Sequence, residues 1–148
     1  MSSLSFPNLA VPDMNIWLAL ASPEHIHHRQ ALQWWQFYAG SIAFCRLSQL
    51  GILRLMTTAA AMDGKPLGIS EAWRVYDRFY EDSRVIFLSE PPSVDETFRI
   101  KAEGHAASPK LWADAWMLAV AEAADGVLVT FDKALEARGA LCLLAKRG

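Results

Sequence analysis

Three aspartates stand where the sequence pattern would bring acidic oxygens together. Asp13 follows the apolar run LAV, residues 9–11, after one proline, and Asp132 follows the run VLVT, residues 127–130. Asp114 lies within the apolar stretch LWADAWMLAVAEAA, residues 111–124. An unpaired carboxylate buried among such side chains is costly, so it needs a cation, hydrogen-bond donors or a proton. Converging carboxylates repel one another, and hard oxygen ligands of this kind suit Mg²⁺ or Mn²⁺.

Each acid also has a simpler interpretation. Asp13 and Asp132 are well placed to be helix N-caps. Asp114 could form a structural ion pair, for example with Arg46 or Arg54. Zinc is disfavoured, because the chain has no HExxH motif, no CxxC pair and no histidines at ligand spacing. We interpret the segment HIHHRQ, residues 25–30, as a surface or helix start rather than a metal site.

The elements that must position these acids alternate between short apolar runs and longer helical patterns. Strands are expected at residues 9–11, 42–45, 85–88, 127–130 and 141–144. Helices are expected at residues 14–21, 24–38, 49–61, 71–81, 94–106, 109–124 and 133–138, with Ser70 and Ser108 as N-caps. Continuous apolar strands between helices predict an α/β protein with a three-layer α/β/α architecture. Its central sheet would be mostly parallel, with about five strands, in a single domain over residues 1–148.

This architecture predicts where the acids meet. Ligands of open α/β sheets bind beyond the carboxyl ends of the strands, and both Asp13 and Asp132 come directly after strands. Asp114 lies about one and a half turns into its helix and can point its carboxylate to the same edge. The sequence therefore predicts one acidic pocket at the carboxyl edge of the sheet.

Composition limits the environment and the partners. The chain has 148 residues, 53% hydrophobic and 20% charged, which fits one globular domain with a substantial core. A net charge of −2 gives no global basic field, so a nucleic acid would be held locally or through a cation. No run is long enough for a membrane span, and the first residues do not have the pattern of a signal peptide. Cys45 and Cys142 lie in apolar runs and are expected to be buried thiols of a cytoplasmic protein.

Four segments in order resemble the PIN-domain ribonucleases: VPDMNIWLALA, CRLSQLGILRLMT, LWADAWMLAVA and VLVTFDKAL. More narrowly, the chain resembles VapC-type toxins of toxin–antitoxin pairs. The resemblance implies a PIN-like fold and Mg²⁺- or Mn²⁺-dependent endoribonuclease activity, hydrolysing RNA phosphodiester bonds. It also implies a cognate VapB-like antitoxin, bound through a helix in an apolar groove, and a homodimer.

The resemblance assigns roles to individual residues. Asp13, Asp114 and Asp132 become the metal ligands, with Asp132 acting directly or through water. Asn15 would orient Asp13 or a water, and Thr130 would hydrogen-bond within the pocket. Gln49 stands where many members carry a glutamate; it can still hold a water or a metal, but it supplies no charge. One well-held ion is therefore a safer expectation than two. Pro12 is a second departure, because it has no N–H for a strand ladder.

Other functions remain open on the sequence. A non-catalytic PIN-like module that binds RNA or protein is the main alternative, motivated by Gln49. A phosphoacceptor receiver domain would need an aspartate after the strand at residues 85–88, where Ser89 and Glu90 stand instead. A phosphohydrolase of the DxDx type would need an aspartate at Asn15.

Overall fold

A five-stranded sheet forms the centre of the molecule. The structure is a computed structural model that describes residues 8–144. Its strands are β1 (Leu9–Pro12), β2 (Ser41–Phe44), β3 (Val85–Phe87), β4 (Val127–Thr130) and β5 (Leu141–Cys142). They lie in the order β3-β2-β1-β4-β5, and every neighbouring pair is parallel. The predicted parallel sheet is therefore confirmed, with strand ends that differ from the expected ones by up to two residues.

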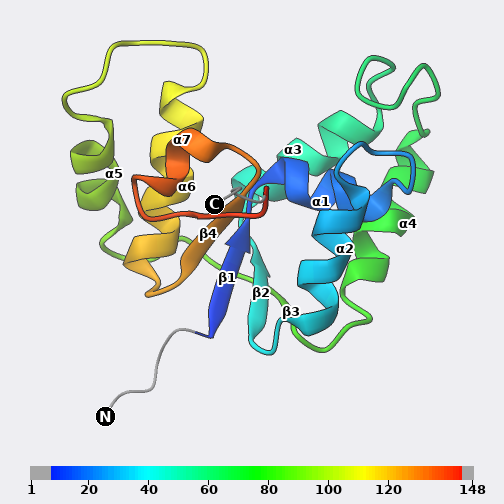
Figure 1. The fold of residues 1–148 in the computed structure, drawn as a ribbon, viewed down its shortest axis with the longest axis horizontal. Helices are drawn as coiled ribbons and strands as arrows, with labels where there is room; N and C mark the ends of the chain where they lie inside the picture. Colours follow the sequence, from blue (N-terminus) through cyan, green and yellow to red (C-terminus); the bar gives the residue numbers. More distant parts are fainter. Residues whose placement is uncertain (1–7, 145–148) are drawn as a thin grey trace.

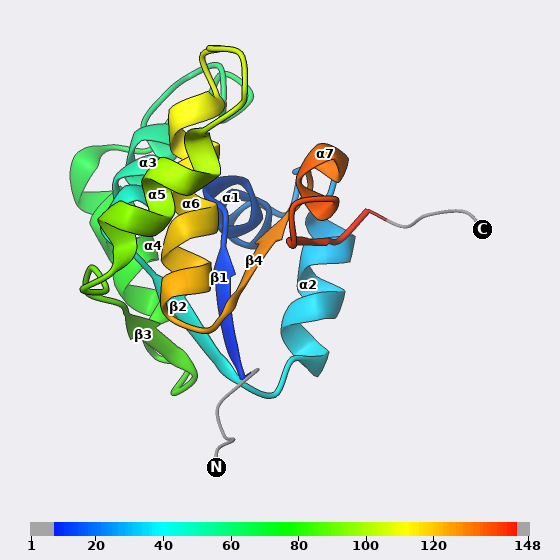
Figure 2. The same ribbon diagram turned by 90° about the vertical axis from the view of Figure 1, so that its left-hand side faces the viewer.

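Helices cover both faces of this sheet (Figures 1 and 2). The described residues form α1 (Met14–Ala21), α2 (His28–Phe37), α3 (Arg46–Met56), α4 (Ile69–Phe79), α5 (Val94–Ala102), α6 (Leu111–Ala123) and α7 (Lys133–Glu136). In Figure 1, α5 and α6 lie on one side of the strands and α1, α2 and α4 on the other. The three-layer α/β/α architecture is thus confirmed.

The two central strands are buried on both faces. Val11 of β1 and Leu128 of β4 pack with side chains of α5 and α6. Their neighbours in the strands, Ala10 and Val129, pack instead with Ile16 of α1. Successive side chains of a strand point to opposite faces, so these strands need apolar residues at every position. This requirement explains the unbroken apolar runs that precede Asp13 and Asp132.

Trp17 joins α1 to the sheet and to the helices beside it. Its side chain is fully buried, and its ring stacks on Phe44 of β2 with the centroids 3.7 Å apart. The ring of Phe79, at the end of α4, meets it edge-on at 4.8 Å. The same cluster includes Ile52 and Met56 of α3. This packing fixes α1, and therefore the residue that caps it, against the carboxyl end of β1.

Two helix starts differ from the prediction. Ser70 lies in the first turn of α4, and Gly68 is the N-cap, where the side chain of Glu71 accepts a hydrogen bond from the Gly68 N–H at 3.0 Å. Ser108 does not cap α6, because residues 109 and 110 form a turn in which the Leu111 N–H donates to the Ser108 carbonyl at 3.2 Å. Both serine assignments were therefore wrong, by two residues along the chain.

Other predictions on the fold are settled by single contacts. Pro12 costs no ladder bond, because β1 pairs with β2 only through Leu9 and Ala10. On the other side of β1, the Asp13 N–H donates to the Val129 carbonyl at 2.8 Å.

Cys45 and Cys142 are buried free thiols, as expected. Over residues 8–144, no helix is long and apolar enough to cross a membrane.

Candidate active site

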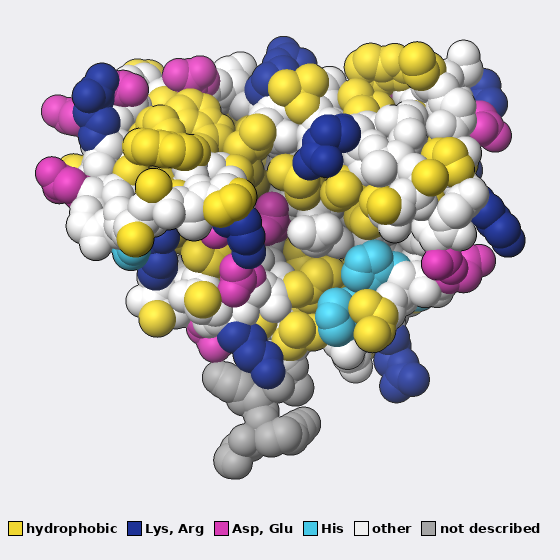
Figure 3. All heavy atoms as spheres, turned by 90° about the horizontal axis from the view of Figure 1, so that it is seen from above, with side chains coloured by type: hydrophobic (Ala, Val, Ile, Leu, Met, Phe, Trp, Pro, Cys, Tyr) yellow, Lys and Arg dark blue, Asp and Glu magenta, His cyan; other side chains and the backbone are white. Residues whose placement is uncertain are grey.

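The three predicted aspartates line one pocket, with a volume of about 670 Å³, at the carboxyl edge of the sheet. Asp13 follows β1, Asp132 follows β4, and Asp114 projects from the first turn of α6. Figure 3 looks down on this edge, where acidic, basic and histidine side chains gather around a central hollow. The complete lining is Asp13, Met14, Asn15, His25, His27, Pro109, Lys110, Ala113, Asp114, Met117, Thr130, Phe131 and Asp132.

Asp13 has few partners for a carboxylate that is partly buried. One oxygen accepts a hydrogen bond from the Met14 N–H at 2.8 Å, which makes Asp13 the N-cap of α1. The other oxygen accepts a longer one from the Thr130 hydroxyl at 3.4 Å. Burial raises the pKa of Asp13, and the Asp114 carboxylate raises it further, against the opposing effects of Met14, Lys110 and Thr130. A nearby positive charge would therefore stabilise the ionised form of Asp13.

The carboxyl group of Asp114 also has a raised pKa, so a nearby positive charge would stabilise its ionised form. Burial raises its pKa and the nearby Asp132 adds to the rise, while Lys110 and Arg138 act in the opposite direction. The ion pair with Arg46 or Arg54 that the sequence left open does not form. Arg46 donates a hydrogen bond to Gln49, and Arg54 contacts the sulfur of Met14 at 3.7 Å.

Asp132 is the acid that already has a cationic partner. The Lys110 ammonium lies 2.8 Å from Asp132 Oδ2, and this bond holds the pKa of the Asp132 carboxyl below its usual range. Asp132 Oδ1 accepts from the Ala134 N–H at 2.9 Å and so caps α7. The N-cap and pocket interpretations of Asp13 and Asp132 are thus compatible, since each carboxylate caps a helix and lines the pocket.

Thr130 connects two of the acids. Its side chain is buried, and its oxygen accepts from the Asp132 N–H at 3.0 Å while its hydroxyl donates to Asp13. Asn15 lines the rim of the pocket and is exposed. Gln49 is not among the lining residues; its amide oxygen accepts from Arg46 Nη1 at 2.5 Å, on α3. The structure therefore brings together five of the six predicted site residues and leaves Gln49 outside.

The types of the lining side chains suit a divalent cation that binds oxygen ligands, but their positions do not form a complete set of ligands. Three carboxylates and one hydroxyl line the pocket together with Lys110, which is the one lysine or arginine among the lining residues. However, within residues 8–144 no three acidic, histidine or cysteine side chains are close enough to ligate one ion together. Asp13 and Asp114 form the pair that needs a cation, whereas Asp132 is directed to Lys110.

Sequence reasoning did not place three lining residues of this pocket in the site. His25, His27 and Phe131 line it together with the aspartates. Residues 24–27, expected to be helical, form turns before α2, which brings the two histidines to the pocket. The histidines of HIHHRQ, two of which line the pocket, were the available signal. Phe131 could have been found from its position between Thr130 and Asp132.

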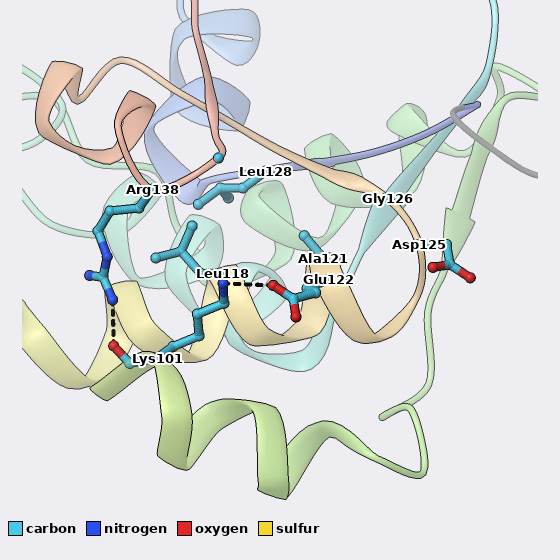
Figure 4. Close-up of a pocket in the computed structure, with 9 residues that line it drawn as sticks. Lys101, Leu118, Ala121, Glu122, Asp125, Gly126, Leu128 and Arg138 are labelled. Carbon is cyan, nitrogen blue, oxygen red and sulfur yellow. Dashed lines mark hydrogen bonds and ion pairs between the residues drawn. The ribbon is translucent and has the colours of Figure 1, made fainter. Parts of the chain in front are cut away.

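A second hollow, of about 500 Å³, lies between α5, α6 and the segment after α7 (Figure 4). Its charged groups bind one another: Lys101 lies 2.6 Å from Glu122, and Arg138 donates to the carbonyl of Lys101. Asp125 stands apart from these groups, in a turn with a positive φ of 58°. The three predicted aspartates line the first pocket and not this hollow, so the first pocket is the candidate site.

Comparisons with known proteins agree with this architecture. The model of the PIN domain family matches residues 10–141. Ribonuclease VapC41 of Mycobacterium tuberculosis is 39% identical over 142 residues, covering 90% of this chain and 97% of its own. Ribonuclease VapC44 of the same organism is 29% identical over 130 residues, covering 85% and 87%.

A solved structure supports the fold. The crystal structure of Mycobacterium tuberculosis VapC20, a sarcin–ricin loop cleaving toxin, superposes with a TM-score of 0.64. It is 13% identical and covers 89% of this chain and 96% of its own. The match of the family model over residues 10–141 and the 39% identical relative show that the chain belongs to the PIN-domain family, in its VapC group.

Proposed function

We propose that this protein is a Mg²⁺- or Mn²⁺-dependent endoribonuclease and the toxin of a toxin–antitoxin pair. The observation that carries the proposal is the acidic pocket at the carboxyl edge of the sheet, which three carboxylates and one lysine line together. Relatives named ribonucleases cover nearly the whole chain, which supports the same activity.

Asp13 and Asp114 would hold the ion, because burial and repulsion by a neighbouring carboxylate raise the pKa of both carboxyl groups. Asp132 would join them directly on releasing Lys110, or through a water. When bound, the ion would neutralise phosphate charge and make a water more acidic. Thr130 keeps Asp13 oriented through its hydroxyl. Asn15, which lines the same pocket, would orient Asp13 or a water.

The proposed partners are an RNA substrate, a VapB-like antitoxin and a second copy of the chain. An antitoxin helix would need an apolar surface, and α3 and α4 expose large apolar side chains. Leu50 of α3 is 57% exposed, and Ile69 and Trp73 of α4 are 74% and 45% exposed. These three side chains are the surface that we assign to the antitoxin.

The position of Gln49 removes the reason for proposing the non-catalytic alternative. It rested on the missing charge at Gln49, but Gln49 does not line the pocket and is hydrogen-bonded to Arg46. The three aspartates carry the pocket charge without it. We therefore favour a catalytic protein.

The direct test is RNA cleavage by the purified protein. We expect cleavage of a mixture of structured and single-stranded RNAs with Mg²⁺ or Mn²⁺, and loss of cleavage when EDTA removes the metal. Restoring Mn²⁺ in excess over EDTA should restore the activity, which separates metal dependence from damage to the protein. Absence of cleavage under every metal condition would favour the non-catalytic alternative.

Metal binding itself is expected to depend on Lys110. The Lys110 ammonium competes with a divalent ion for the same carboxylates, so Lys110→Met should increase Mn²⁺ affinity about tenfold, the effect of roughly 1.4 kcal/mol of lost competition. Mn²⁺ at about one hundred times its Kd should stabilise the folded protein by about 2.7 kcal/mol. Thermal unfolding against Mn²⁺ concentration measures both effects.

Lys133→Met is the matched control, since Lys133 is exposed at the start of α7 and does not line the pocket. It should leave the Mn²⁺ titration unchanged. Weaker Mn²⁺ binding by Lys110→Met would show that the lysine helps to bind the metal rather than competing with it.

A further inference from the structure

Three rings form one wall of the acidic pocket. The His27 and Phe131 ring centroids lie 4.8 Å apart, and His25 lies 6.0 Å from Phe131 and 5.9 Å from His27. The histidines come from the segment between α1 and α2, whereas Phe131 lies between β4 and α7. All three are partly exposed, and all three line the pocket with the aspartates.

Packing alone does not account for these residues. Phe131 rests against the small apolar cluster of Ala10, Ile16 and Val129, yet part of its ring remains open. Nδ1 of His27 is buried and has no hydrogen-bond partner among the described residues. A buried nitrogen without a partner costs stability, so an apolar side chain would fill this space better. A role in binding a ligand explains an imidazole here.

The histidines are also poorly arranged as metal ligands. Nδ1 of His25 accepts a hydrogen bond from the His27 N–H at 3.0 Å, so one ring nitrogen of His25 is already used. Burial, with smaller effects of the neighbouring His27 and His28, lowers the pKa of His25 and favours an uncharged ring. The uncharged imidazole of His25 and the rings of His27 and Phe131 offer flat faces, which are the surfaces on which nucleobases stack.

We propose that His25, His27 and Phe131 form a nucleobase subsite, on which a base next to the cleaved phosphodiester stacks. The inference rests on the proposed ribonuclease function. Phe131 directly precedes Asp132 and follows Thr130, so the rings and the acids belong to one cavity. A nucleotide whose phosphate reaches the acids would have its base beside these rings. The subsite would thus help to select and position the RNA without contacting the scissile phosphate.

Histidine NMR signals provide a test that needs no cleavage. The chain has four histidines, and adenosine 5′-monophosphate with Mg²⁺ should shift the ring signals of His25 and His27. His28, bonded to the Ala19 carbonyl at 2.7 Å, and the exposed His105 serve as internal controls. Ribose 5-phosphate, which carries the phosphate without a base, should give much smaller shifts at His25 and His27.

A substitution extends the test to affinity. Phe131→Leu should weaken binding of the nucleotide about tenfold, the scale of losing one ring that stacks on a base. Phe37→Leu is the matched control, because Phe37 is 81% exposed at the end of α2 and does not line the pocket. It should leave binding unchanged.

The outcomes separate this inference from the proposed function. Equal shifts with ribose 5-phosphate, or no shifts with the nucleotide, would overturn the subsite even if the protein cleaves RNA. Base-dependent shifts in a protein that cleaves no RNA would support the subsite and overturn the nuclease proposal.

Discussion

Asp13→Asn is expected to reduce RNA cleavage by about a thousandfold or more, a loss of about 4 kcal/mol in transition-state stabilisation. Asparagine keeps the oxygen that caps α1 at Met14 but removes the charge that would hold the cation. Asp114→Asn should have a similar effect. Both are measured as cleavage rates at saturating Mn²⁺, beside Mn²⁺ binding followed by thermal unfolding.

Asp63→Asn is the matched control. Asp63 is exposed in a turn with a positive φ of 57°, a conformation that asparagine also adopts readily. It should keep full activity. Cleavage by Asp13→Asn at a rate close to that of the unmodified protein would show that the acidic pocket is not the active site.

The same substitution has a pH signature in metal-free protein. The folded state raises the pKa of Asp13 above 3.8, so it binds more protons there than the unfolded chain does. The stability from this group is therefore complete below pH 3.8 and is lost as the pH rises through the raised folded pKa. Asp13→Asn lacks this loss and should be at least as stable at neutral pH. Urea unfolding across a pH series checks the sign, and lower stability of the variant at neutral pH would contradict it.

Trp17→Ala is expected to lower the free energy of unfolding by about 3–5 kcal/mol. The side chain is fully buried and stacks on Phe44 at 3.7 Å, so its loss leaves a large cavity between α1, β2 and α4. Chemical unfolding measures the effect. Because Asp13 caps the same helix, weaker packing of α1 against the sheet should also lower the affinity for Mn²⁺.

Two further tryptophan variants make this prediction sharper. Trp17 Nε1 is buried without a hydrogen-bond partner among the described residues, so Trp17→Phe removes an unsatisfied donor and should cost far less than Trp17→Ala. Trp112→Ala, at a side chain that is 59% exposed on α6, should change stability by less than about 1 kcal/mol. A similar loss in all three variants would exclude a specific role of Trp17.

The sequence predicted the sheet well because its signal was strong. Runs such as VLV, at residues 127–129, are apolar at every position, and only strands covered on both faces require that. The carboxyl edge then followed from the parallel arrangement, and with it the common location of Asp13 and Asp132. Helix ends were less predictable, since Ser108 had a suitable side chain but the local turn moved the helix start to Leu111.

Parts of the pocket were not predictable for similar reasons. The pairing of Lys110 with Asp132 joins residues 22 positions apart, which no local pattern encodes. His25 and His27 were not assigned to the pocket because residues 24–38 were expected to form one helix, whereas residues 24–27 form turns. Gln49 was assigned to the site by resemblance alone, and its amide oxygen instead accepts a hydrogen bond from Arg46, three residues earlier on α3.

The strand order has a consequence for biosynthesis. β1 stands at the centre of the sheet, but its neighbour β4 is formed by residues 127–130, late in the chain. A nascent or truncated polypeptide that stops before β4 has Asp13 at an open edge, without Thr130 or Asp132. The complete pocket can therefore assemble only once the residues up to Asp132 have emerged from the ribosome.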